Sequence, residues 1–395
     1  MMDAITINNL DVVFGNKQQQ ALDLLDQGKS RQEIIDQTGQ VVGVDNVSMT
    51  VKEGEICVLM GLSGSGKSSL LRAVNGLNSI SRGSLEIKDG EQSVNLADCD
   101  EGTLRHLRTH RVSMVFQKFA LMPWLTVLDN VAFGLEMQGV PKAKRREKAR
   151  EQLEMVGLAE WETKHPHELS GGMQQRVGLA RAFAMDTDIL LMDEPFSALD
   201  PLIRAQLQDE LILLQKKLNK TILFVSHDLD EALKIGNNIA IMESGKLIQH
   251  GKPEQIVLAP ETEYVKDFVA HTNPLNVLKG RSLMQMREQL ISRDDQWQIC
   301  SRDDLWVKQQ TNGVALVDSD KTLLDWSDGT FEMAQVSESN VVQASPEIGM
   351  REAIELKQRS NQPILLVENN QLVGVLTDNE LYDALLGNFK DRRVA

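Results

Sequence analysis

The chain has 395 residues and a formal net charge of −15, and 42% of its residues are hydrophobic. This length suits two or three domains of roughly 100–200 residues, and the composition is typical of a globular protein with a buried core. The negative charge argues against non-specific nucleic-acid binding, which needs a basic surface, so we expect no nucleic-acid partner.

The sequence has no segment typical of a membrane span or a secretion signal. The longest apolar runs fall far short of the ~20 residues that a membrane-spanning helix requires: 56–62, 189–192 and 364–367. The N-terminus lacks a basic region followed by an apolar core. The three cysteines are far apart and fit reduced thiols better than disulfides or a metal site: Cys57, Cys99 and Cys300. We therefore expect a soluble, cytoplasmic chain that reaches a membrane only through a partner.

An opening strand is predicted over residues 5–14, and an unusual helical segment follows at 18–42. Ser30 and Glu33 have the spacing of a capping box. Two short helices around a glycine break are consistent with a DNA-reading helix-turn-helix or with an accessory hairpin on a larger domain. The segment carries four acidic residues against two basic ones, so it would repel phosphate, and we favour the accessory hairpin.

Residues 61–68 read GLSGSGKS, which matches the G-x-x-x-x-G-K-[ST] loop that binds nucleotide phosphates. The preceding apolar run, 54–60, predicts a strand, and 68–77 predicts a helix. Glycines let the backbone turn its N–H groups toward phosphate oxygens, and the helix start adds a favourable dipole. We expect Lys67 to contact the phosphates, Ser68 to bind Mg²⁺ and Ser69 to reach the α-phosphate. The predicted ATP-binding residues here are Gly61, Leu62, Ser63, Gly64, Ser65, Gly66, Lys67, Ser68 and Ser69.

Short apolar runs at 112–116, 189–192, 221–225 and 239–242 predict further strands separated by helices. This alternation favours a largely parallel sheet covered on both faces. Residues 119–168 are helical in pattern instead. A basic cluster within them is either a solvated helix face or a surface near anionic lipid or a membrane partner: Lys142, Lys144, Arg145, Arg146, Lys148 and Arg150.

Two adjacent carboxylates, Asp193 and Glu194, end the buried apolar run at 189–192. At the end of a core strand, Asp193 suits a magnesium site, where it would hold a metal-bound water. Glu194 suits the polarisation of the attacking water. His227 directly follows the strand predicted at 221–225.

The last part of the chain has no glycine-rich phosphate loop. Residues 362–381 predict a strand, an Asn-rich turn, a second strand, a Thr-Asp cap and a helix. This pattern resembles the second half of a cystathionine-β-synthase-type (CBS) regulatory module, which we place at 338–390. Residues 313–318 are a candidate remnant of a first copy, within a degenerate CBS-like segment at 276–335. The alternative is a small α/β cap without a ligand.

The order of the motifs resembles the ATP-binding cassette (ABC) ATPases. The phosphate loop is followed by LSGGMQQR at 169–176, by ILLMDEP at 189–195, by SALD at 197–200 and by His227. The resemblance implies an α/β fold: a P-loop NTPase of the ABC nucleotide-binding type at 1–272, with an inserted α-helical subdomain at 119–184. The small α/β CBS-like domain would follow it.

The resemblance also implies roles for individual residues. His227 would contact the γ-phosphate, and Gln117 would touch Mg²⁺ and the attacking water. Phe14 would lie under adenine, although it is also a candidate core residue of the first strand. The signature and the following loop would meet ATP bound by a second copy, giving a homodimer with two MgATP; their residues are Ser170, Gly171, Gly172, Gln174 and Asp200.

Several segments resemble the ATPases of glycine betaine, proline betaine and choline importers: the insertion at 18–42, FALMPW at 119–124 and residues 192–204. Residues 268–278 are most similar to the choline branch. The resemblance implies a permease partner contacted through residues 117–130, including Trp124, and an indirect link to a substrate-binding protein. The chain would lie at the cytoplasmic face of the inner membrane. Alternatives are the ATPase of a sugar or amino-acid importer and an ABC ATPase of translation or DNA repair.

Overall fold

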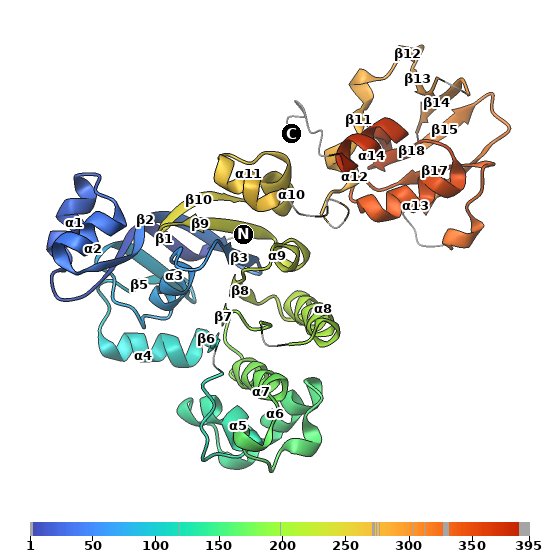
Figure 1. The fold of residues 1–395 in the computed structure, drawn as a ribbon. Coiled ribbons are helices and arrows are strands. Elements are labelled where there is room, and N and C mark those ends of the chain that lie inside the picture. Colours follow the sequence, from blue (N-terminus) through green and yellow to red (C-terminus); the bar gives the residue numbers. More distant parts are fainter. Residues whose placement is uncertain are drawn as a thin grey trace. The chain divides into compact units, whose positions relative to one another are not determined.

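The computed structural model describes residues 3–117, 119–197, 199–270, 273, 275, 277–301, 303–311, 313–326 and 332–386. The chain forms two compact units (Figure 1). The first contains Met1–Ile256 and Glu261–Val265, and the second contains Val257–Pro260 and Lys266–Ala395. Four positions of the segment that indicates the choline branch lie outside the described residues: His271, Thr272, Pro274 and Asn276.

The first unit contains a six-stranded sheet in the order β10-β9-β3-β8-β7-β6. Its strands are parallel except for the antiparallel pair of β9 and β10, so the predicted parallel sheet is confirmed. The strands span Ile56–Met60 (β3), Val112–Val115 (β6), Ile189–Asp193 (β7), Thr221–Val225 (β8), Asn238–Glu243 (β9) and Lys246–Gly251 (β10). β3, β6, β7 and β8 are entirely buried, which explains their continuous apolar runs.

A four-stranded antiparallel sheet, β2-β1-β4-β5, lies in the same unit and was not predicted. Its strands span Asp3–Phe14 (β1), Val41–Lys52 (β2), Arg82–Asp89 (β4) and Gln92–Asn95 (β5). Helix α3 (Lys67–Val74) contacts strands of both sheets, and its apolar residues belong to a core shared by them.

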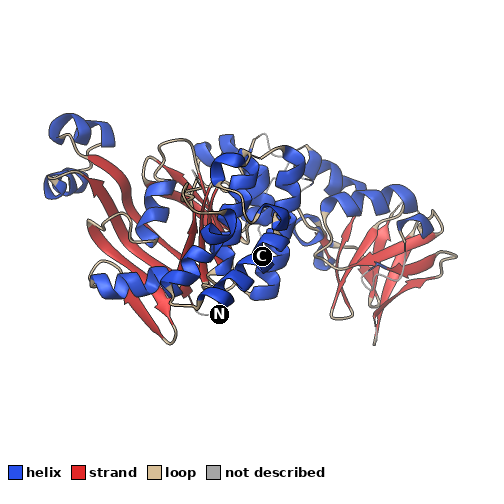
Figure 2. Cartoon of the chain, turned by 90° about the horizontal axis from the view of Figure 1, so that it is seen from below, coloured by secondary structure: helices blue, strands red, loops and turns tan. Residues whose placement is uncertain are grey.

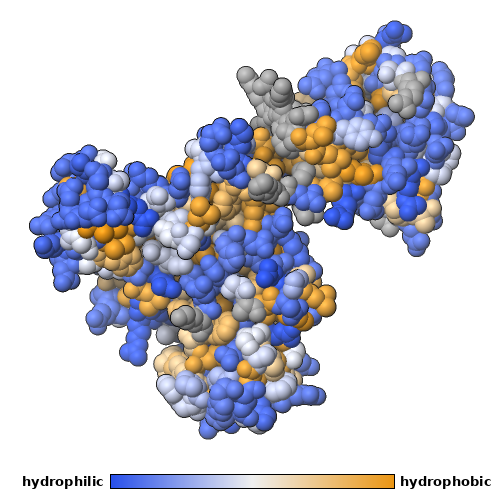
Figure 3. All heavy atoms as spheres, in the orientation of Figure 1, coloured by the Kyte–Doolittle hydropathy of each residue, from blue (hydrophilic) through white to orange (hydrophobic). Residues whose placement is uncertain are grey.

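The insertion between β1 and β2 is a helical hairpin, formed by α1 (Gln18–Asp26) and α2 (Arg31–Thr38). Its apolar side chains make a small cluster with the two strands, of which Ala21, Ile34 and Val42 are fully buried. The exposed side of the hairpin is mostly hydrophilic (Figure 3). The hairpin therefore packs as expected for an accessory element of the larger domain.

The helical subdomain has its own hydrophobic core. Its main helices are α5 (Val127–Met137), α6 (Lys142–Met155) and α7 (Gly171–Ala184), with short 3₁₀ turns at Ala159–Trp161 and Pro166–Glu168. The three arginines of the basic cluster on α6 pair with carboxylates of the same subdomain: Arg145 with Glu136, Arg146 with Asp129 and Arg150 with Glu162. These pairs favour the solvated helix face over a surface for anionic lipid.

The remaining helices of the first unit are α4 (Glu101–His110), α8 (Pro201–Leu218), α9 (Leu229–Ile235) and α10 (Pro253–Leu258), and α11 (Glu263–Val269) follows. Both helices and strands make up this unit (Figure 2). In the described part of the chain, no helix is long and apolar enough to cross a bilayer.

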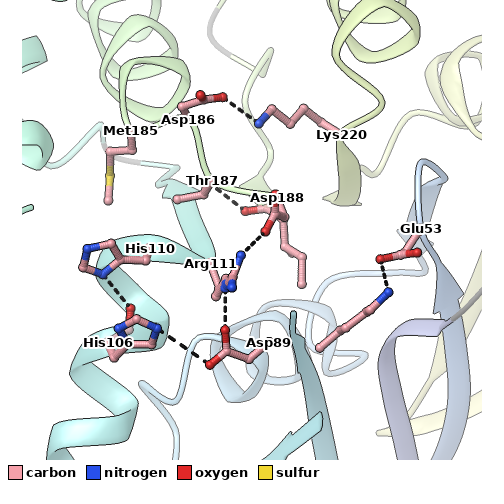
Figure 4. Close-up of polar contacts among 12 residues, drawn as sticks. Glu53, Asp89, His106, His110, Arg111, Met185, Asp186, Thr187, Asp188 and Lys220 are labelled. Carbon is pink, nitrogen blue, oxygen red and sulfur yellow. Dashed lines mark hydrogen bonds and ion pairs between the residues drawn. The ribbon is translucent and has the colours of Figure 1, made fainter. Parts of the chain in front are cut away.

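An ion-pair network joins the two sheets at the start of β6 (Figure 4). The Arg111 guanidinium donates to Asp89 Oδ1 at 2.6 Å and to Asp188 Oδ2 at 2.8 Å. Asp89 ends β4, and Asp188 precedes β7. The network thus ties the antiparallel sheet to the edge of the parallel sheet.

The second unit contains a five-stranded sheet, β11-β19-β18-β17-β16, and a four-stranded sheet, β12-β13-β14-β15. The five-stranded sheet is formed by Gln285–Met286 (β11), Thr322–Asp325 (β16), Asn340–Ala344 (β17), Ile364–Glu368 (β18) and Gln371–Leu376 (β19). The helices are α12 (Gly280–Leu283), α13 (Met350–Ser360) and α14 (Asp378–Leu385). The strand–turn–strand–cap–helix prediction is confirmed, including a capping box between Thr377 and Glu380.

The candidate remnant of a first CBS copy has a different topology from the second half. Within this candidate remnant, residues 313–317 form strand β15 (Gly313–Val317). This strand belongs to an antiparallel sheet with β12 (Ser292–Arg293), β13 (Gln296–Cys300) and β14 (Leu305–Gln310). The only α-helix in the described part of 276–335 is α12, so this segment does not repeat the β17–α13–β18–β19–α14 order. The structure therefore does not support a first copy of the CBS-type module in this segment.

Candidate functional site

The predicted catalytic motifs follow four strands that are neighbours in the parallel sheet. The sheet order places β3, β8, β7 and β6 side by side. The phosphate loop follows β3, and His227 follows β8. Asp193 ends β7 with Glu194 directly after it, and Gln117 follows β6. The carboxyl ends of parallel strands lie at one edge of a sheet, where ligands of open α/β folds bind. Motifs that are far apart in the sequence are thereby brought together.

The phosphate loop requires glycine at Gly61 and Gly66. Both have a positive φ, 137° and 105°. A Cβ atom at Gly61 would lie 2.1 Å from Met242 O, and one at Gly66 would lie 2.4 Å from Gly43 O. Gly64 also has a positive φ of 78°, but a Cβ atom there would meet no other atom within 4 Å. Close packing against neighbouring backbone thus forms a narrow loop that larger residues could not adopt.

Lys67 begins α3, and its side chain is buried inside the phosphate loop. Its ammonium donates to Gly61 O at 2.7 Å, to Leu62 O at 2.9 Å and more weakly to Ser65 Oγ at 3.4 Å. Burial lowers the pKa of Lys67 from its ordinary value, and the charges of Glu194 and Asp193 partly offset this. A buried cation whose direct partners are neutral oxygens suits an anionic phosphate group.

Ser68 and Asp193 supply the oxygens of the candidate magnesium site. Ser68 Oγ donates to Asp193 Oδ1 at 2.9 Å, and Asp193 is 1% exposed. Arg72 lies 3.4 Å from the other carboxylate oxygen and stabilises its charge. Mg²⁺ prefers one or two protein oxygens together with phosphate oxygens and water. The hydroxyl–carboxylate pair beside the phosphate loop therefore fits this metal.

Glu194 lies between the two other predicted catalytic side chains. Gln117 Nε2 donates to Glu194 Oε2 at 3.0 Å, and His227 Nδ1 lies 3.5 Å from the same oxygen. The His227 side chain is 64% exposed, so it faces solvent at this edge. Glu194 has a φ of +50°, a conformation that costs a non-glycine residue about 1–3 kcal/mol.

Phe14 ends β1 beside the start of α3 and is 39% exposed. The alternative that it is a core residue is therefore wrong. A Cβ atom at Gly43 would lie 2.6 Å from the Phe14 ring and 3.1 Å from Ser69 Oγ. The ring thus lies against the β2 backbone, close to the predicted α-phosphate residue. The Phe14 side chain is thus partly accessible, and its contact with adenine stays a prediction.

The signature residues lie at the start of α7, away from the interactions of the phosphate loop. Ser170 is exposed and caps α7 by accepting from Met173 N at 3.4 Å. Gly171 has open space around it, and Gly172 faces Leu199. Gln174 donates its amide nitrogen to carbonyls of its own loop, those of Pro166 and Leu169.

Asp200 is exposed and caps α8 by accepting from Ile203 N at 3.1 Å. The hydrogen bonds described for Ser170, Gln174 and Asp200 are made with nearby residues of the same loop or helix. Their predicted contacts with ATP therefore remain predictions.

Four residues of the site were missed from the sequence: Arg31, Gly43, Arg72 and Tyr264. The Arg31 guanidinium donates to Gly64 O at 3.0 Å, and Leu62 N donates to Tyr264 Oη at 3.3 Å. A glycine that interrupts the apolar run of β2 was the available signal for Gly43. Arg72 lies four residues after Ser68, one helical turn along the same face. Nothing in the sequence indicated Arg31 or Tyr264.

The comparisons with known proteins agree with this geometry. Residues 44–197 match the ABC transporter family. A solved structure, a dimeric post-hydrolysis state of the ATP-binding cassette MJ0796 bound to ADP and Pi, is similar with a TM-score of 0.54 and 29% identity. The match covers 63% of this chain and 98% of that one. The fold and the site therefore define a nucleotide-binding ABC ATPase.

Full-length relatives narrow the family further. The chain is 41% identical to the glycine betaine/proline betaine transport system ATP-binding protein ProV of Salmonella typhimurium, over 96% of this chain and 97% of that protein. It is 40% identical to the glycine betaine transport ATP-binding protein OpuAA of Bacillus subtilis, over 97% and 93%. The chain belongs to the glycine betaine-type family of ABC transporter ATP-binding subunits, whose ATPase activity energises import.

Proposed function

We propose that two copies of the chain bind two MgATP molecules between them. Each phosphate loop would hold one ATP, with Ser68 and Asp193 at the metal and the partner's signature at the γ-phosphate. The exposed helix start at Ser170 would present backbone N–H groups to such an anion. The similar cassette MJ0796 is dimeric in its solved structure, which supports this arrangement.

Hydrolysis would depend on Glu194 and the two side chains next to it, Gln117 and His227. The Glu194 carboxylate would polarise the attacking water, while His227 and Gln117 would orient the carboxylate and the water. Mg²⁺ would neutralise charge on the phosphate oxygens. The convergence of this group with the phosphate loop at one sheet edge is the observation that carries the proposal.

The imported substrate would be a quaternary ammonium compound, such as choline, glycine betaine or proline betaine. Relatives of this chain are named for transport of glycine betaine, proline betaine and, in one case, choline. The substrate would bind a permease and a separate binding protein rather than this chain. An aromatic cage suits the charge of such compounds, because π faces attract cations.

The permease would contact the region 117–130, which precedes and begins α5. Trp124 lies there with 73% of its surface exposed. A large aromatic side chain that is exposed to this degree is typical of an interface anchor. Through this contact the chain would lie peripherally at the inner face of the membrane.

Uptake of labelled choline and glycine betaine tests the proposal. We would compare cells that lack the gene with cells that carry the wild type or Glu194→Gln. Uptake restored only by the wild type would support the function, and competition between the two compounds would identify the preferred one. Uptake of both compounds independent of the gene would refute the substrate assignment but leave the ATPase intact.

A further inference from the structure

The accessory hairpin reaches the phosphate loop through one side chain. Arg31 is the first residue of α2, and its guanidinium donates to Gly64 O in the middle of the loop at 3.0 Å. We propose that Arg31 is a positioning residue that holds the phosphate loop and raises its affinity for nucleotide phosphates. This inference rests on the proposed ATP site and gives the hairpin a role in it.

The hairpin is anchored firmly enough to position a side chain. A capping box between Ser30 and Glu33 fixes the start of α2, with Ser30 N donating to Glu33 Oε2 at 2.9 Å. Ile34 is fully buried against the antiparallel sheet. Arg82 of β4 also donates to both carboxylate oxygens of Asp26, at 2.7 and 2.9 Å. The arginine at the start of α2 is therefore presented from a rigid support.

Gly64 is the point where such support has most effect. Its φ is positive, and nothing lies within 4 Å of the place where a Cβ atom would be, so no neighbour packs against that side of the residue. Ordering a glycine-rich segment costs more conformational entropy than ordering other residues. A hydrogen bond that holds Gly64 before the nucleotide arrives lowers the ordering cost of binding.

The charge of Arg31 adds an electrostatic contribution. Its guanidinium is half-buried, and burial lowers the pKa of Arg31 while Asp45 partly offsets this. An arginine stays protonated nonetheless. Its hydrogen-bond acceptor is a neutral carbonyl, and no described carboxylate pairs with it at ion-pair distance. The positive charge thus remains available to attract phosphates at the loop.

The test is the dependence of ATPase rate on ATP concentration for Arg31→Ala, Arg31→Lys and Arg31→Gln. We expect Arg31→Ala to raise KM for ATP about tenfold, the loss typical of one charge-assisted hydrogen bond, with kcat unchanged within about twofold. Arg31→Lys should recover part of the affinity, because it restores the charge but not the planar donor geometry. Arg31→Gln should recover less, because it retains only donor capacity.

Two further variants distinguish an error in the role of Arg31 from an error in the ATP site itself. Lys29→Ala removes a positive charge from the same hairpin, where Lys29 pairs with Glu33 at 3.0 Å, and should keep the wild-type KM. Lys67→Ala should lose nucleotide binding. An unchanged KM in Arg31→Ala, or an equal rise in Lys29→Ala, would overturn the role of Arg31. Wild-type affinity in Lys67→Ala would instead overturn the ATP site itself. Equal thermal unfolding midpoints would show that the hairpin variants are folded.

Discussion

Glu194→Gln separates ATP binding from hydrolysis. The substitution keeps the size and hydrogen-bonding shape of the side chain but removes its charge and its ability to accept a proton. In the structure, one carboxylate oxygen accepts from Gln117 at 3.0 Å and lies 3.5 Å from His227 Nδ1. A glutamine oxygen can take the same place, so we expect the arrangement of the three side chains to persist.

The size of the effect follows from the role of the carboxylate. A positioned general base contributes about 10²–10⁴-fold to a rate, so kcat should fall about a thousandfold. ATP affinity should stay equal or rise. Glu194 interacts electrostatically with Lys67, and removal of a negative charge near the phosphate loop lessens the repulsion of phosphate. The variant should therefore accumulate as an ATP-bound dimer.

Phosphate release and size-exclusion chromatography with ATP measure these two effects. A matched control is Glu210→Gln on α8, whose carboxylate accepts from Gln206 at 3.0 Å and lies outside the predicted catalytic set. The control should hydrolyse ATP at the wild-type rate and form no trapped dimer. Normal turnover by Glu194→Gln would remove this residue from the mechanism, and loss of ATP binding would show that it acts structurally.

Three other substitutions follow from the structure. Burial raises the pKa of Glu231, which accepts from Ser226 Oγ at 2.5 Å. Because the pKa of Glu231 is higher in the folded protein than its ordinary value of 4.5, the folded state is favoured by protonation of this group. The free energy of unfolding should therefore fall as the pH rises from 4.5 through the folded-state pKa. Glu231→Gln should therefore reduce the loss of stability with rising pH. Unfolding midpoints of wild type and variant that change with pH in parallel would contradict this. Phe14→Ala should raise KM for ATP about tenfold, since stacking on a base contributes about 1–3 kcal/mol; an unchanged KM would leave the ring with a packing role. Trp124→Ala should abolish uptake while ATP binding persists, and loss of both would indicate misfolding.

The sequence was sufficient to locate the parallel strands and the phosphate loop. Continuous apolar runs identify strands buried on both faces, and the loop has its own motif. The same patterns could not give the sheet order, because periodicity says nothing about which strands are neighbours. The order explains why Gln117 and His227 meet at Glu194 although β6 and β8 are separated in the sequence by the helical subdomain and α8.

Two kinds of structural feature could not be predicted from the sequence. The antiparallel sheet joins β1 and β2 across the hairpin and then adds β4 and β5, which depends on pairing between distant segments. Contacts of single side chains with backbone atoms, such as Arg31 with Gly64 O, leave no recurring pattern. Arginine and tyrosine on helices usually face solvent, so their positions alone carry little information.

The backbone at Glu194 connects the fold to the chemistry. If Glu194 were extended, it would continue β7, and its side chain would point to one face of the sheet. Instead, Glu194 N donates to Val225 O at the end of β8, at 3.1 Å, and Ser197 Oγ donates to Glu194 O at 3.0 Å. These two bonds offset part of the cost of the positive φ, and the carboxylate lies next to Gln117 and His227. The strand β8 therefore contributes twice to the site: its Val225 carbonyl stabilises the strained backbone of Glu194, and His227, which follows β8, lies beside the Glu194 carboxylate.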